Sequence, residues 1–448
     1  MKELNINSLL NLELINKATI YVYSNQSSIR LNYTCQFIFN HVLKCNYLIC
    51  TSINEFENYS GPKINYSLNY NNKSINIPVH NFLENVCPIN NKLKIEIDNA
   101  NEFILFKNEI KNFDFNFDLF SAVFACISRY EEWINTKFDS HNRFEIESSL
   151  FYKNNYHLQP IVDEWIIHLK ELIEKIFKCN LNTNSFKQIC TIDIDNLYAF
   201  KHKGFVRNIG GAVKDLFQLK INLIIQRISV CLNITKDPFD VYDELIKHLS
   251  NSKIDVLFFY LLHTGNKFDR TLSPLNKAFK ENIKKISELA LTGLHPSYYS
   301  STNNEFLNNE VNLYKTLTGK EVEISRQHYL KFDIKSTPNL LHSKGIKADF
   351  TMGFASKAGF RAGTSFPFYY FDFKTNLPLS LLAVPFCAMD GAYIIYETTK
   401  QEEALIQLKH LKEKVKSVGG LFITVFHERT FSKTHYKNAS ELFYKIYN

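Results

Sequence analysis

The sequence lacks several motifs that mark common classes of enzyme. It contains no Walker A loop, no G-x-G-x-x-G fingerprint and no G-x-S-x-G elbow, which excludes the phosphate-binding, dinucleotide-binding and serine-nucleophile sites that carry those signatures. The net charge is +7, but no block of lysine and arginine forms a nucleic-acid-binding arm. No apolar run reaches the length of a membrane span. We therefore expect no nucleic-acid partner and no membrane span.

Cysteine pairs of the C-x-x-C type are also absent, and the nine cysteines are odd in number. Most of them lie in apolar runs, as Cys126, Cys190, Cys231 and Cys387 do. This placement is typical of buried free thiols in a reducing compartment. The first residues of the chain are acidic and polar and contain no apolar signal core. These features predict a cytoplasmic protein.

The length of the chain predicts more than one domain. Its 448 residues are 45% hydrophobic and 22% charged, which suits two or three globular domains with a sizeable core. Residues 1–110 contain short β-rich runs between Asn-rich turns, and residues 111–185 contain two helical patterns. We expect the helical unit to complete a smaller mixed α+β N-terminal domain, which ends in the polar stretch of residues 180–185.

One charged cluster stands out in this N-terminal region. Arg129, Glu131 and Glu132 follow an apolar helical run that Asp118 is expected to cap. A solvated or interface cluster is the favoured interpretation of these three residues, ahead of a functional site.

From residue 186 to the end of the chain, strand-like and helix-like segments alternate. This alternation predicts a parallel α/β sheet or barrel, in which functional residues collect at the carboxyl ends of the strands. Nine residues of metal-ligand or acid–base type follow the predicted strands: Asp193, Asp195, His263, His295, Arg326, His328, Asp349, Asp390 and His427. Because they occupy equivalent places, we interpret them as one site.

A long amphipathic segment interrupts this alternation at residues 209–233. Charged residues break its apolar pattern at Lys214, Asp215, Lys220 and Arg227. A helix that covers the sheet is the favoured interpretation, ahead of membrane binding.

Asp193 and Asp195 end the first strand of this second region. Residues i and i+2 of a strand point to the same side, so both carboxylates are expected to project together. Such a pair can hold a divalent metal, or serve one metal and one proton transfer. A turn or helix cap is the alternative for an isolated D-x-D.

Together, the acids and histidines at the strand ends permit metal-assisted hydrolysis. Asp and His ligands with open positions suit zinc or a similar ion that activates water. A second carboxylate can take the proton of the water, an arginine can orient that carboxylate, and a histidine on the opposite side can protonate the leaving atom. Arg361, in the Gly-Phe-Arg-Ala-Gly stretch of residues 359–363, is expected in a loop at the rim of the site.

The order of motifs in residues 186–448 resembles that of polysaccharide deacetylases of the NodB-homology type. Thr-Ile-Asp-Ile-Asp at residues 191–195 resembles the first motif, T-F-D-D, in the D-x-D form of outlying members. The second motif, H-[ST]-x-x-[HS], is similar to the segment that begins at His295, where Tyr299 occupies the second ligand position. Arg-Gln-His-Tyr at residues 326–329 resembles R-x-P-Y, and His427 matches the histidine that follows the last strand.

The resemblance implies an irregular (β/α) barrel, a divalent metal such as zinc, and deacetylase chemistry. It makes Asp193 the base, and it makes Asp195 and His295 metal ligands, although the inserted Ile194 leaves the order of the two acids open. It implies that Arg326 orients the base. His427 would then be the general acid.

Four further residues near these motifs are candidates for roles in the site. His328 either supplies the missing metal ligand or is a packed histidine, and both alternatives stay open. Tyr329, Arg361 and Asp390 are the candidates for contacts with the substrate.

The N-terminal region resembles an uncharacterised domain that precedes deacetylase-like domains in some bacterial proteins. The residues that carry this resemblance are Ser-Arg-Tyr-Glu-Glu at 128–132 and Pro-Ile-Val-Asp at 160–163. This resemblance names no activity.

The resulting expectation is a metal-dependent hydrolase that deacetylates an N-acetylated amino sugar in a polysaccharide or glycan precursor. Tyr299 at the expected ligand position supports one alternative, a non-catalytic glycan-binding protein on a degenerate barrel. A glycoside hydrolase-like enzyme is the other alternative, since two carboxylates roughly 5–10 Å apart across a sugar cleft would favour it. The sequence names neither the glycan nor the oligomeric state.

Overall fold

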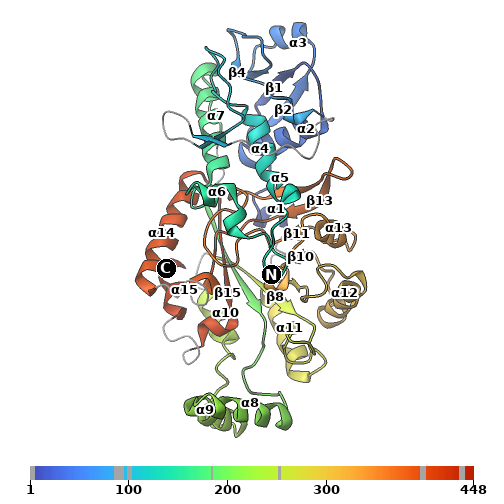
Figure 1. Cartoon of the computed structure of the whole chain (residues 1–448), viewed down its shortest axis with the longest axis vertical. Coiled ribbons are helices and arrows are strands. Elements are labelled where there is room, and N and C mark those ends of the chain that lie inside the picture. The colour runs from blue at the N-terminus through green and yellow to red at the C-terminus, as the bar shows by residue number, and fades with distance from the viewer. Residues whose placement is uncertain are drawn as a thin grey trace.

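Two β-sheets organise the described part of the chain, a small parallel sheet and a large, mostly parallel one. The computed structural model describes residues 6–84, 95–97, 103–182, 185–250, 254–393, 400–432 and 439–447. A small sheet lies at the top of the molecule in Figure 1, and a large sheet lies below it. One continuous cluster of buried side chains joins the two sheets.

The small sheet has four strands in the order β2-β1-β3-β4, and every pairing in it is parallel. Its strands are β1 (Thr19–Ser24), β2 (Asn46–Cys50), β3 (Lys63–Tyr66) and β4 (Ile75–Ile77). Because parallel neighbours need crossover connections, helices α2 (Ile29–Cys35) and α3 (Ile53–Asn58) and the π-helix at Gln36–Val42 lie between them in the chain. The small sheet is therefore parallel throughout, which the mixed α+β expectation for this region did not specify.

Further helices of the N-terminal half pack around this sheet. Asp118 caps α4 (Leu119–Ile127) by accepting a hydrogen bond from the Ser121 backbone N–H, as the sequence suggested. The remaining elements of this half are α1 (Ile6–Leu9), the antiparallel pair β5 (Ile95–Ile97) and β6 (Phe103–Leu105), α5 (Tyr130–Ile134), α6 (Leu150–Lys153) and α7 (Ile161–Phe177). Ile6 and Leu9 of α1 pack with apolar residues of the large sheet instead. Figure 1 shows α4 and α7 beside the small sheet.

The large sheet has nine strands in the order β12-β13-β11-β10-β9-β8-β7-β15-β14. The strands are β7 (Lys187–Ile194), β8 (Asp255–Leu261), β9 (Leu291–His295), β10 (Ile324–Ser325), β11 (Ala348–Asp349), β12 (Phe368–Asp372), β13 (Leu377–Ala383), β14 (Ala388–Met389) and β15 (Leu421–His427). Only β12 and β13 pair antiparallel. The predicted parallel α/β architecture is confirmed, but no pairing among the described strands joins β12 to β14, so hydrogen bonds do not close a barrel there.

Helices connect the strands of the large sheet and cover it. They are α10 (Tyr242–Ser250), α11 (Lys277–Leu289), α12 (Asn304–Thr318), α13 (Thr337–His342), α14 (Gln401–Ser417) and α15 (Ala439–Tyr447). Strand β7 is buried from Ile189 onward and pairs with β8 on one side and β15 on the other. The register places His427 opposite Asp193, and His295 opposite Leu261. Polar residues that end these parallel strands therefore meet at one edge of the sheet.

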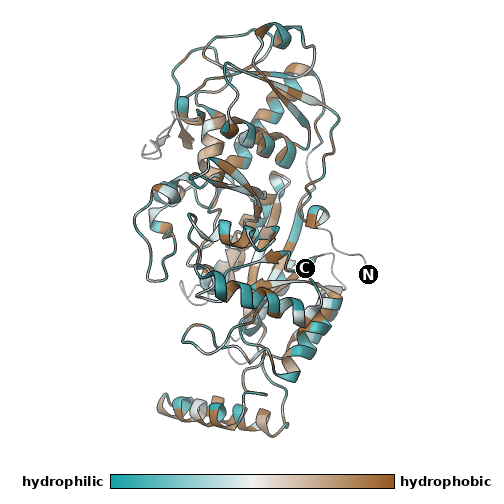
Figure 2. Cartoon of the chain, turned by 90° about the vertical axis from the view of Figure 1, so that its right-hand side faces the viewer, coloured by the Kyte–Doolittle hydropathy of each residue, from teal (hydrophilic) through white to brown (hydrophobic). Residues whose placement is uncertain are grey.

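The segment at residues 209–233 does not cover the sheet. It forms two helices, α8 (Phe205–Phe217) and α9 (Ile221–Cys231), which project from the lower end of the molecule (Figures 1 and 2). No residue of α8 is buried. The expectation of a covering helix is wrong because the apolar face of α8 points outward. Across the described residues, no helix combines the length and apolar character needed to cross a membrane.

A buried ion cluster joins the N-terminal half to the large sheet. Arg361 donates two hydrogen bonds to Glu132, over 2.8 and 2.6 Å, and Arg129 donates another to Glu132 over 2.8 Å. All three side chains are at most 3% exposed. The sequence suggested that Arg361 lies at the rim of a ligand site, but in the structure it is buried against Glu132. The charged cluster of the N-terminal region lies at an interface within the chain, which was the favoured interpretation.

A second polar link lies at the start of α7. The buried Asp163 carboxylate accepts hydrogen bonds from the Thr364 hydroxyl and from the backbone and hydroxyl of Ser365, the latter two over 2.8 and 2.7 Å. The neighbouring Val162 N–H donates to the Gly363 carbonyl over 2.9 Å. Burial raises the pKa of Asp163 to about 7, and these hydrogen bonds oppose the rise.

Replacement of Glu132 by Gln is expected to destabilise the chain strongly. Burial raises the pKa of Glu132, but the charges of Arg361 and Arg129 lower it more, so the group is ionised. Glu132→Gln would remove the carboxylate that pairs with the buried Arg361 and would leave Arg129 with Glu131 alone, at a cost of about 3–5 kcal/mol in the free energy of unfolding. Urea denaturation measures this loss.

The matched control for this prediction is Glu413→Gln, which removes a carboxylate from an exposed pair with Lys416. We expect a change within about 0.5 kcal/mol for the control. Equal effects of the two substitutions would contradict a structural role for Glu132.

The Asp163 carboxyl is expected to make stability depend on pH. Because its pKa is raised to about 7 in the folded chain, its contribution is fully present below its unfolded pKa of about 4 and is lost as the pH rises through about 7. Asp163→Asn cannot ionise. The difference in unfolding free energy between wild type and variant should therefore fall by roughly 1–3 kcal/mol from about pH 5 to about pH 8. A difference that stays constant with pH would count against this account.

Candidate metal centre

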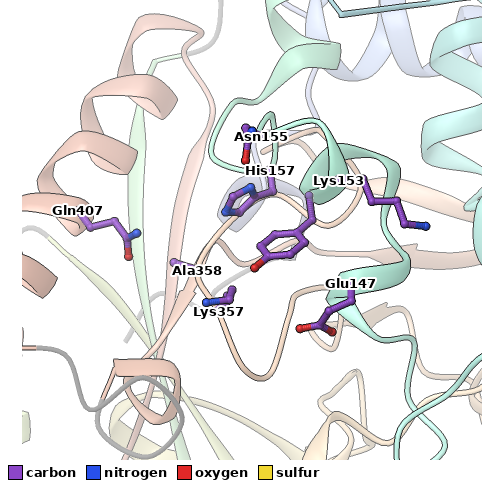
Figure 3. Close-up of a pocket in the computed structure, with 8 residues that line it drawn as sticks. Glu147, Lys153, Asn155, His157, Lys357, Ala358 and Gln407 are labelled. Atoms are coloured by element: carbon purple, nitrogen blue, oxygen red, sulfur yellow. The ribbon is translucent and has the colours of Figure 1, made fainter. Parts of the chain in front are cut away.

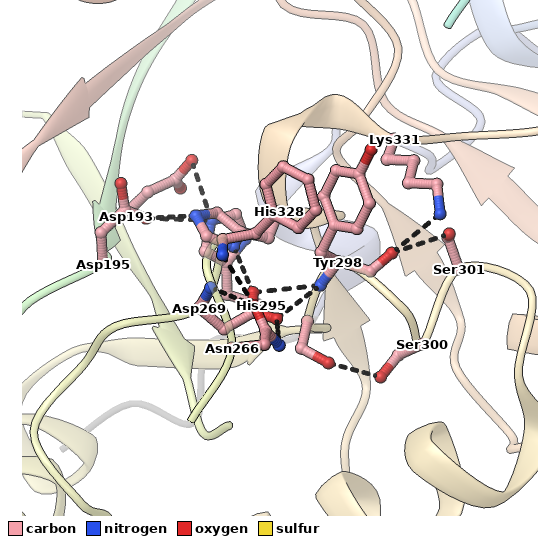
Figure 4. Close-up of polar contacts among 12 residues, drawn as sticks. Asp193, Asp195, Asn266, Asp269, His295, Tyr298, Ser300, Ser301, His328 and Lys331 are labelled. Carbon is pink, nitrogen blue, oxygen red and sulfur yellow. Dashed lines mark hydrogen bonds and ion pairs between the residues drawn. The ribbon is translucent and has the colours of Figure 1, made fainter. Parts of the chain in front are cut away.

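Polar residues from several strand ends line one pocket of about 490 Å³. Asp193 and Asp195 come from the end of β7, His295 from the end of β9, His328 from the turn after β10, and His427 from the end of β15. Figure 4 shows the two aspartates and His295 and His328 turned toward one another. The structure thus brings together most of the strand-end residues that the sequence singled out.

Three of these side chains converge on one point. Asp195 Oδ1 lies 3.3 Å from His295 Nε2 and 3.5 Å from His328 Nε2. The ligand atoms of the three residues all lie within 4.8 Å of one another. Asp195 Oδ1 is buried and makes no hydrogen bond, although an unpaired buried carboxylate oxygen is costly. One oxygen and two imidazole nitrogens are a donor set that suits zinc or a similar divalent ion, so these residues fit a metal.

Hydrogen bonds on the far side of each imidazole orient both histidines. His295 Nδ1 lies 2.5 Å from the Arg326 carbonyl oxygen, and His328 Nδ1 lies 2.7 Å from Asp269 Oδ1. Because a carbonyl and a carboxylate accept, each Nδ1 carries the proton and each Nε2 presents its lone pair to the pocket. Of the alternatives left open for His328, this geometry favours a ligand over a packed histidine.

Asp269 is a residue that sequence reasoning missed. It is buried and also accepts hydrogen bonds from the Tyr298 backbone and the Asn266 side chain. Burial raises its pKa, but the hydrogen bond from His328 leads the contributions that lower it below its usual value. It lies in a loop after β8, eight residues beyond the strand, so no strand-end pattern in the sequence points to it.

Arg326 holds Asp193 beside the three candidate ligands. Its Nη1 donates to Asp193 Oδ1 over 2.7 Å, and its Nε donates to the Phe350 carbonyl over 2.9 Å. The guanidinium is fully buried and stacks on the Phe259 ring at 4.7 Å. Asp193 Oδ2 lies 3.8 Å from His295 Nε2. Asp193 is therefore next to the three converging atoms and is held by a different partner.

His427 faces Asp195 from another side. Its Nε2 lies 3.8 Å from Asp195 Oδ2, and its Nδ1 lies 2.7 Å from Asp390 Oδ1. Burial lowers the pKa of His427, but the Asp390 carboxylate leads the charges that raise it to about 9. Asp390 is buried and also accepts from the His427 backbone N–H. Asp390 therefore orients His427, whereas the sequence suggested that it contacts the substrate.

Two charged residues after His427 also reach Asp195. Arg429 Nη1 donates to Asp195 Oδ2 over 2.9 Å, and Glu428 Oε2 accepts from the Asp195 backbone N–H over 3.1 Å. Burial raises the pKa of Asp195, but the charges of His328 and His427, among others, hold it well below its usual value. Burial also raises the pKa of Glu428 to about 8. Their position directly after His427 was the only sequence signal for these two residues.

Three residues from the motif analysis lie elsewhere. The His263 ring packs edge-on against Phe306, and the buried Asp349 accepts hydrogen bonds from Thr351 and Tyr370. Neither lines the pocket, and neither does Tyr299, which is 41% exposed.

Tyr329 lies at the mouth of the pocket and is 37% exposed. Its backbone carbonyl accepts a hydrogen bond from Arg143, a pocket residue contributed by the N-terminal half of the chain. The rim of the site is therefore built from both halves.

A second pocket, of about 470 Å³, lies between α6 and α14 (Figure 3). Its lining includes Glu147, Lys153, His157 and Lys357. It contains none of the strand-end carboxylates, and we assign it no role in the metal centre.

Metal analysis tests the proposed ligands. Purified wild type is expected to contain about one divalent ion per chain, and Asp195→Ala and His328→Ala are expected to lose it. Asp269→Asn should weaken the affinity for the ion by about 10–100-fold, because it weakens the support of His328. Elemental analysis and titration with zinc measure these effects.

The matched control for the metal analysis is His263→Gln, which changes a strand-end histidine outside the pocket. It should bind the ion as wild type does. An ion retained by both ligand variants would show that the metal is bound elsewhere.

Comparisons with known proteins give a family match for part of the chain and weak structural similarities. Residues 20–178 match the model of a family of unknown function (DUF7033). No curated protein matches the chain. A putative polysaccharide deacetylase from Mycobacterium smegmatis aligns with a TM-score of 0.38 and 13% identity, over 59% of this chain and 84% of that one.

Two other solved structures align over 58% of this chain. A mutant of a CE4 family pseudoenzyme with restored enzymatic activity has a TM-score of 0.27 and 10% identity, and 64% of its chain is covered. A GH57 branching enzyme from Thermococcus kodakaraensis has a TM-score of 0.33 and 8% identity, and 67% of its chain is covered. Likenesses this weak carry no conclusion about activity. The matched family names no activity either.

Proposed function

We propose that this chain is a metal-dependent hydrolase that removes an acetyl group from an N-acetylated amino sugar. The observation that carries the proposal is the pair of oriented proton-transfer groups around one candidate metal centre. Asp193, held by Arg326, and His427, held by Asp390, lie within 3.8 Å of different atoms of that centre. A general base and a general acid around one bound ion are the parts that amide hydrolysis requires.

The chemistry divides between the ion and the side chains of the chain. A divalent ion held by Asp195, His295 and His328 would supply Lewis acidity to the amide carbonyl and to the attacking water. Asp193 accepts the proton that the water loses as its oxygen bonds to the carbonyl carbon. His427, protonated at neutral pH because its pKa is raised to about 9, donates a proton to the nitrogen as the carbon–nitrogen bond breaks. The products are acetate and the free amine.

The lining of the pocket supports a carbohydrate substrate. Phe268 and Tyr329 line its mouth with their ring centroids 5.6 Å apart, and aromatic rings offer apolar faces with polar edges. The Gln327 side chain also lines the pocket, and neither of its polar atoms has a hydrogen-bond partner. A ligand with hydroxyl groups would satisfy such buried polar atoms.

The position of His328 weakens the case for a non-catalytic glycan-binding protein. That alternative depended on Tyr299, which occupies the place of a metal ligand in the motif. In the structure, His328 supplies the third ligand atom instead, beside Asp195 and His295. A missing ligand at residue 299 therefore does not by itself argue against catalysis.

Acetate release tests the proposal. The zinc-loaded chain is expected to release acetate from N-acetylated hexosamine oligomers, and a chelator is expected to abolish this activity. Asp193→Asn and His427→Gln should each lower kcat by about 10²–10⁴-fold while the metal content stays at the wild-type value. Those variants separate proton transfer from metal binding, which the ligand variants do not.

The control variant for the activity assay is His263→Gln, which should keep the wild-type kcat. A metal-loaded wild type that releases no acetate from any acetylated amino sugar would overturn the proposed reaction. If the same protein bound those sugars, a glycan-binding role would replace it.

A further inference from the structure

The helical hairpin formed by α8 and α9 stands apart from the rest of the molecule. It begins eleven residues after the end of β7 and extends beyond the other helices in Figure 1. Many of the exposed large apolar side chains of the described residues lie in this short stretch. They are Phe205, Val206, Ile209, Val213, Leu216, Phe217, Leu219, Ile221, Ile225, Ile228, Leu232 and Ile234. Their exposed fractions run from 46% to 85%.

The two helices turn their polar sides toward each other and their apolar sides outward. Arg227 of α9 donates to Asp215 over 2.6 Å and to Asn208 over 3.2 Å, and both partners are in α8. Ile209, Val213 and Leu216 follow the i, i+4, i+7 spacing of one helical face, and that face is exposed. In Figure 2 the ribbon of the hairpin carries apolar residues along its length, with polar residues between them. This arrangement is the reverse of a helix pair that buries its apolar stripe.

The base of the hairpin is held in place by specific contacts. The buried Asp237 carboxylate accepts hydrogen bonds from the backbone N–H groups of Ala199, Phe200 and Lys201, and so joins the two connecting arms. The Arg227 guanidinium lies 4.6 Å from the centre of the Phe200 ring. These contacts fix the hairpin to the rest of the molecule. The exposed apolar face therefore belongs to an anchored pair of helices.

The charge of this segment is strongly one-sided. Residues 201–236 contain seven basic residues and one acidic residue, Asp215, so their net charge is 7 − 1 = +6, against +7 for the whole chain. The single acid is already paired with Arg227. The exposed Lys214 and Lys220 lie beside the apolar residues that end α8 and begin α9.

These features point to one kind of occupant. Two hairpins of this charge would repel each other across a dimer interface, and a nucleic acid would leave the apolar face uncovered. An anionic lipid surface meets both demands, because apolar side chains enter the headgroup boundary while lysines and arginines meet lipid charge. We propose that the α8–α9 hairpin binds the surface of an anionic membrane without crossing it.

The position of the hairpin has a consequence for the metal centre. The hairpin leaves the carboxyl end of β7, which is the edge of the sheet that carries Asp193 and Asp195. Arg207, in the first turn of α8, donates to the backbone carbonyl of Arg270 over 2.7 Å, and Arg270 lines the pocket. Membrane binding through the hairpin would therefore bring a lipid surface to the side of the molecule on which the pocket opens.

Vesicle binding by the full chain tests this proposal. The assay compares co-sedimentation with vesicles of phosphatidylcholine alone and of phosphatidylcholine mixed with phosphatidylglycerol, at low and at high salt. Wild type is expected to bind the anionic vesicles, and more weakly at high salt. Two sets of variants should weaken binding at least about tenfold. They are the apolar set Phe205→Ser, Phe217→Ser and Leu219→Ser, and the charge set Lys214→Glu and Lys220→Glu.

The matched control is a set of three apolar-to-Ser changes at comparably exposed positions elsewhere, Leu68→Ser, Tyr70→Ser and Ile406→Ser. It should bind vesicles as wild type does. Thermal unfolding of all variants checks that the fold is kept, which the exposure of every changed side chain favours.

Two results would overturn the proposal. Wild type that does not bind anionic vesicles, or that binds them equally well after the hairpin substitutions, excludes the hairpin as a lipid-binding element. A lipid-free dimer that the apolar set converts to monomer, together with absent vesicle binding, would assign the hairpin to an interface between copies of the chain. Neither result depends on whether the metal centre hydrolyses a sugar amide.

Discussion

The buried Arg326 is the residue on which the geometry of the candidate site depends. Its guanidinium is fixed by Asp193, by the Phe350 carbonyl and by the Phe259 ring, and its own carbonyl oxygen orients His295. One residue therefore positions both a candidate base and a candidate metal ligand. A buried guanidinium without a countercharge is costly, so Asp193 is constrained in turn, although the Nη2 group of Arg326 has no hydrogen-bond partner among the described residues.

The same physical rule governs the junction between the two halves of the chain. Glu132 lies between two buried arginines, one from each half, and Asp163 receives its donors from residues 364 and 365. These acids belong to residues 128–132 and 160–163, the two stretches that carry the resemblance of the N-terminal region to an uncharacterised domain. Their positions show that such motifs can record the contacts between domains, since each buried charge needs its own partner. The N-terminal half also reaches the pocket through Arg143.

The site itself combines residues separated by more than 200 positions in the chain. Parallel strands bring their carboxyl ends to one edge, and the register of β7 with β15 sets His427 opposite Asp193. Three histidines then surround Asp195, each oriented by an acceptor on its other nitrogen. Arginines offset the charges of both aspartates, because Asp195 also forms an ion pair with Arg429 and Asp193 forms one with Arg326. The arrangement explains how so many ionisable groups share a small buried volume.

The sequence by itself determined the alternation of strands and helices and the placement of acids and histidines at strand ends. Those features are local, because periodicity and turn residues act over a few positions. Only the tertiary structure decided which strand-end residues meet. It excluded His263 and Asp349, turned Arg361 toward Glu132, and supplied Asp269 from a loop. It also decided that residues 205–231 project from the sheet, since an amphipathic pattern specifies which face of a helix is apolar but not what covers that face.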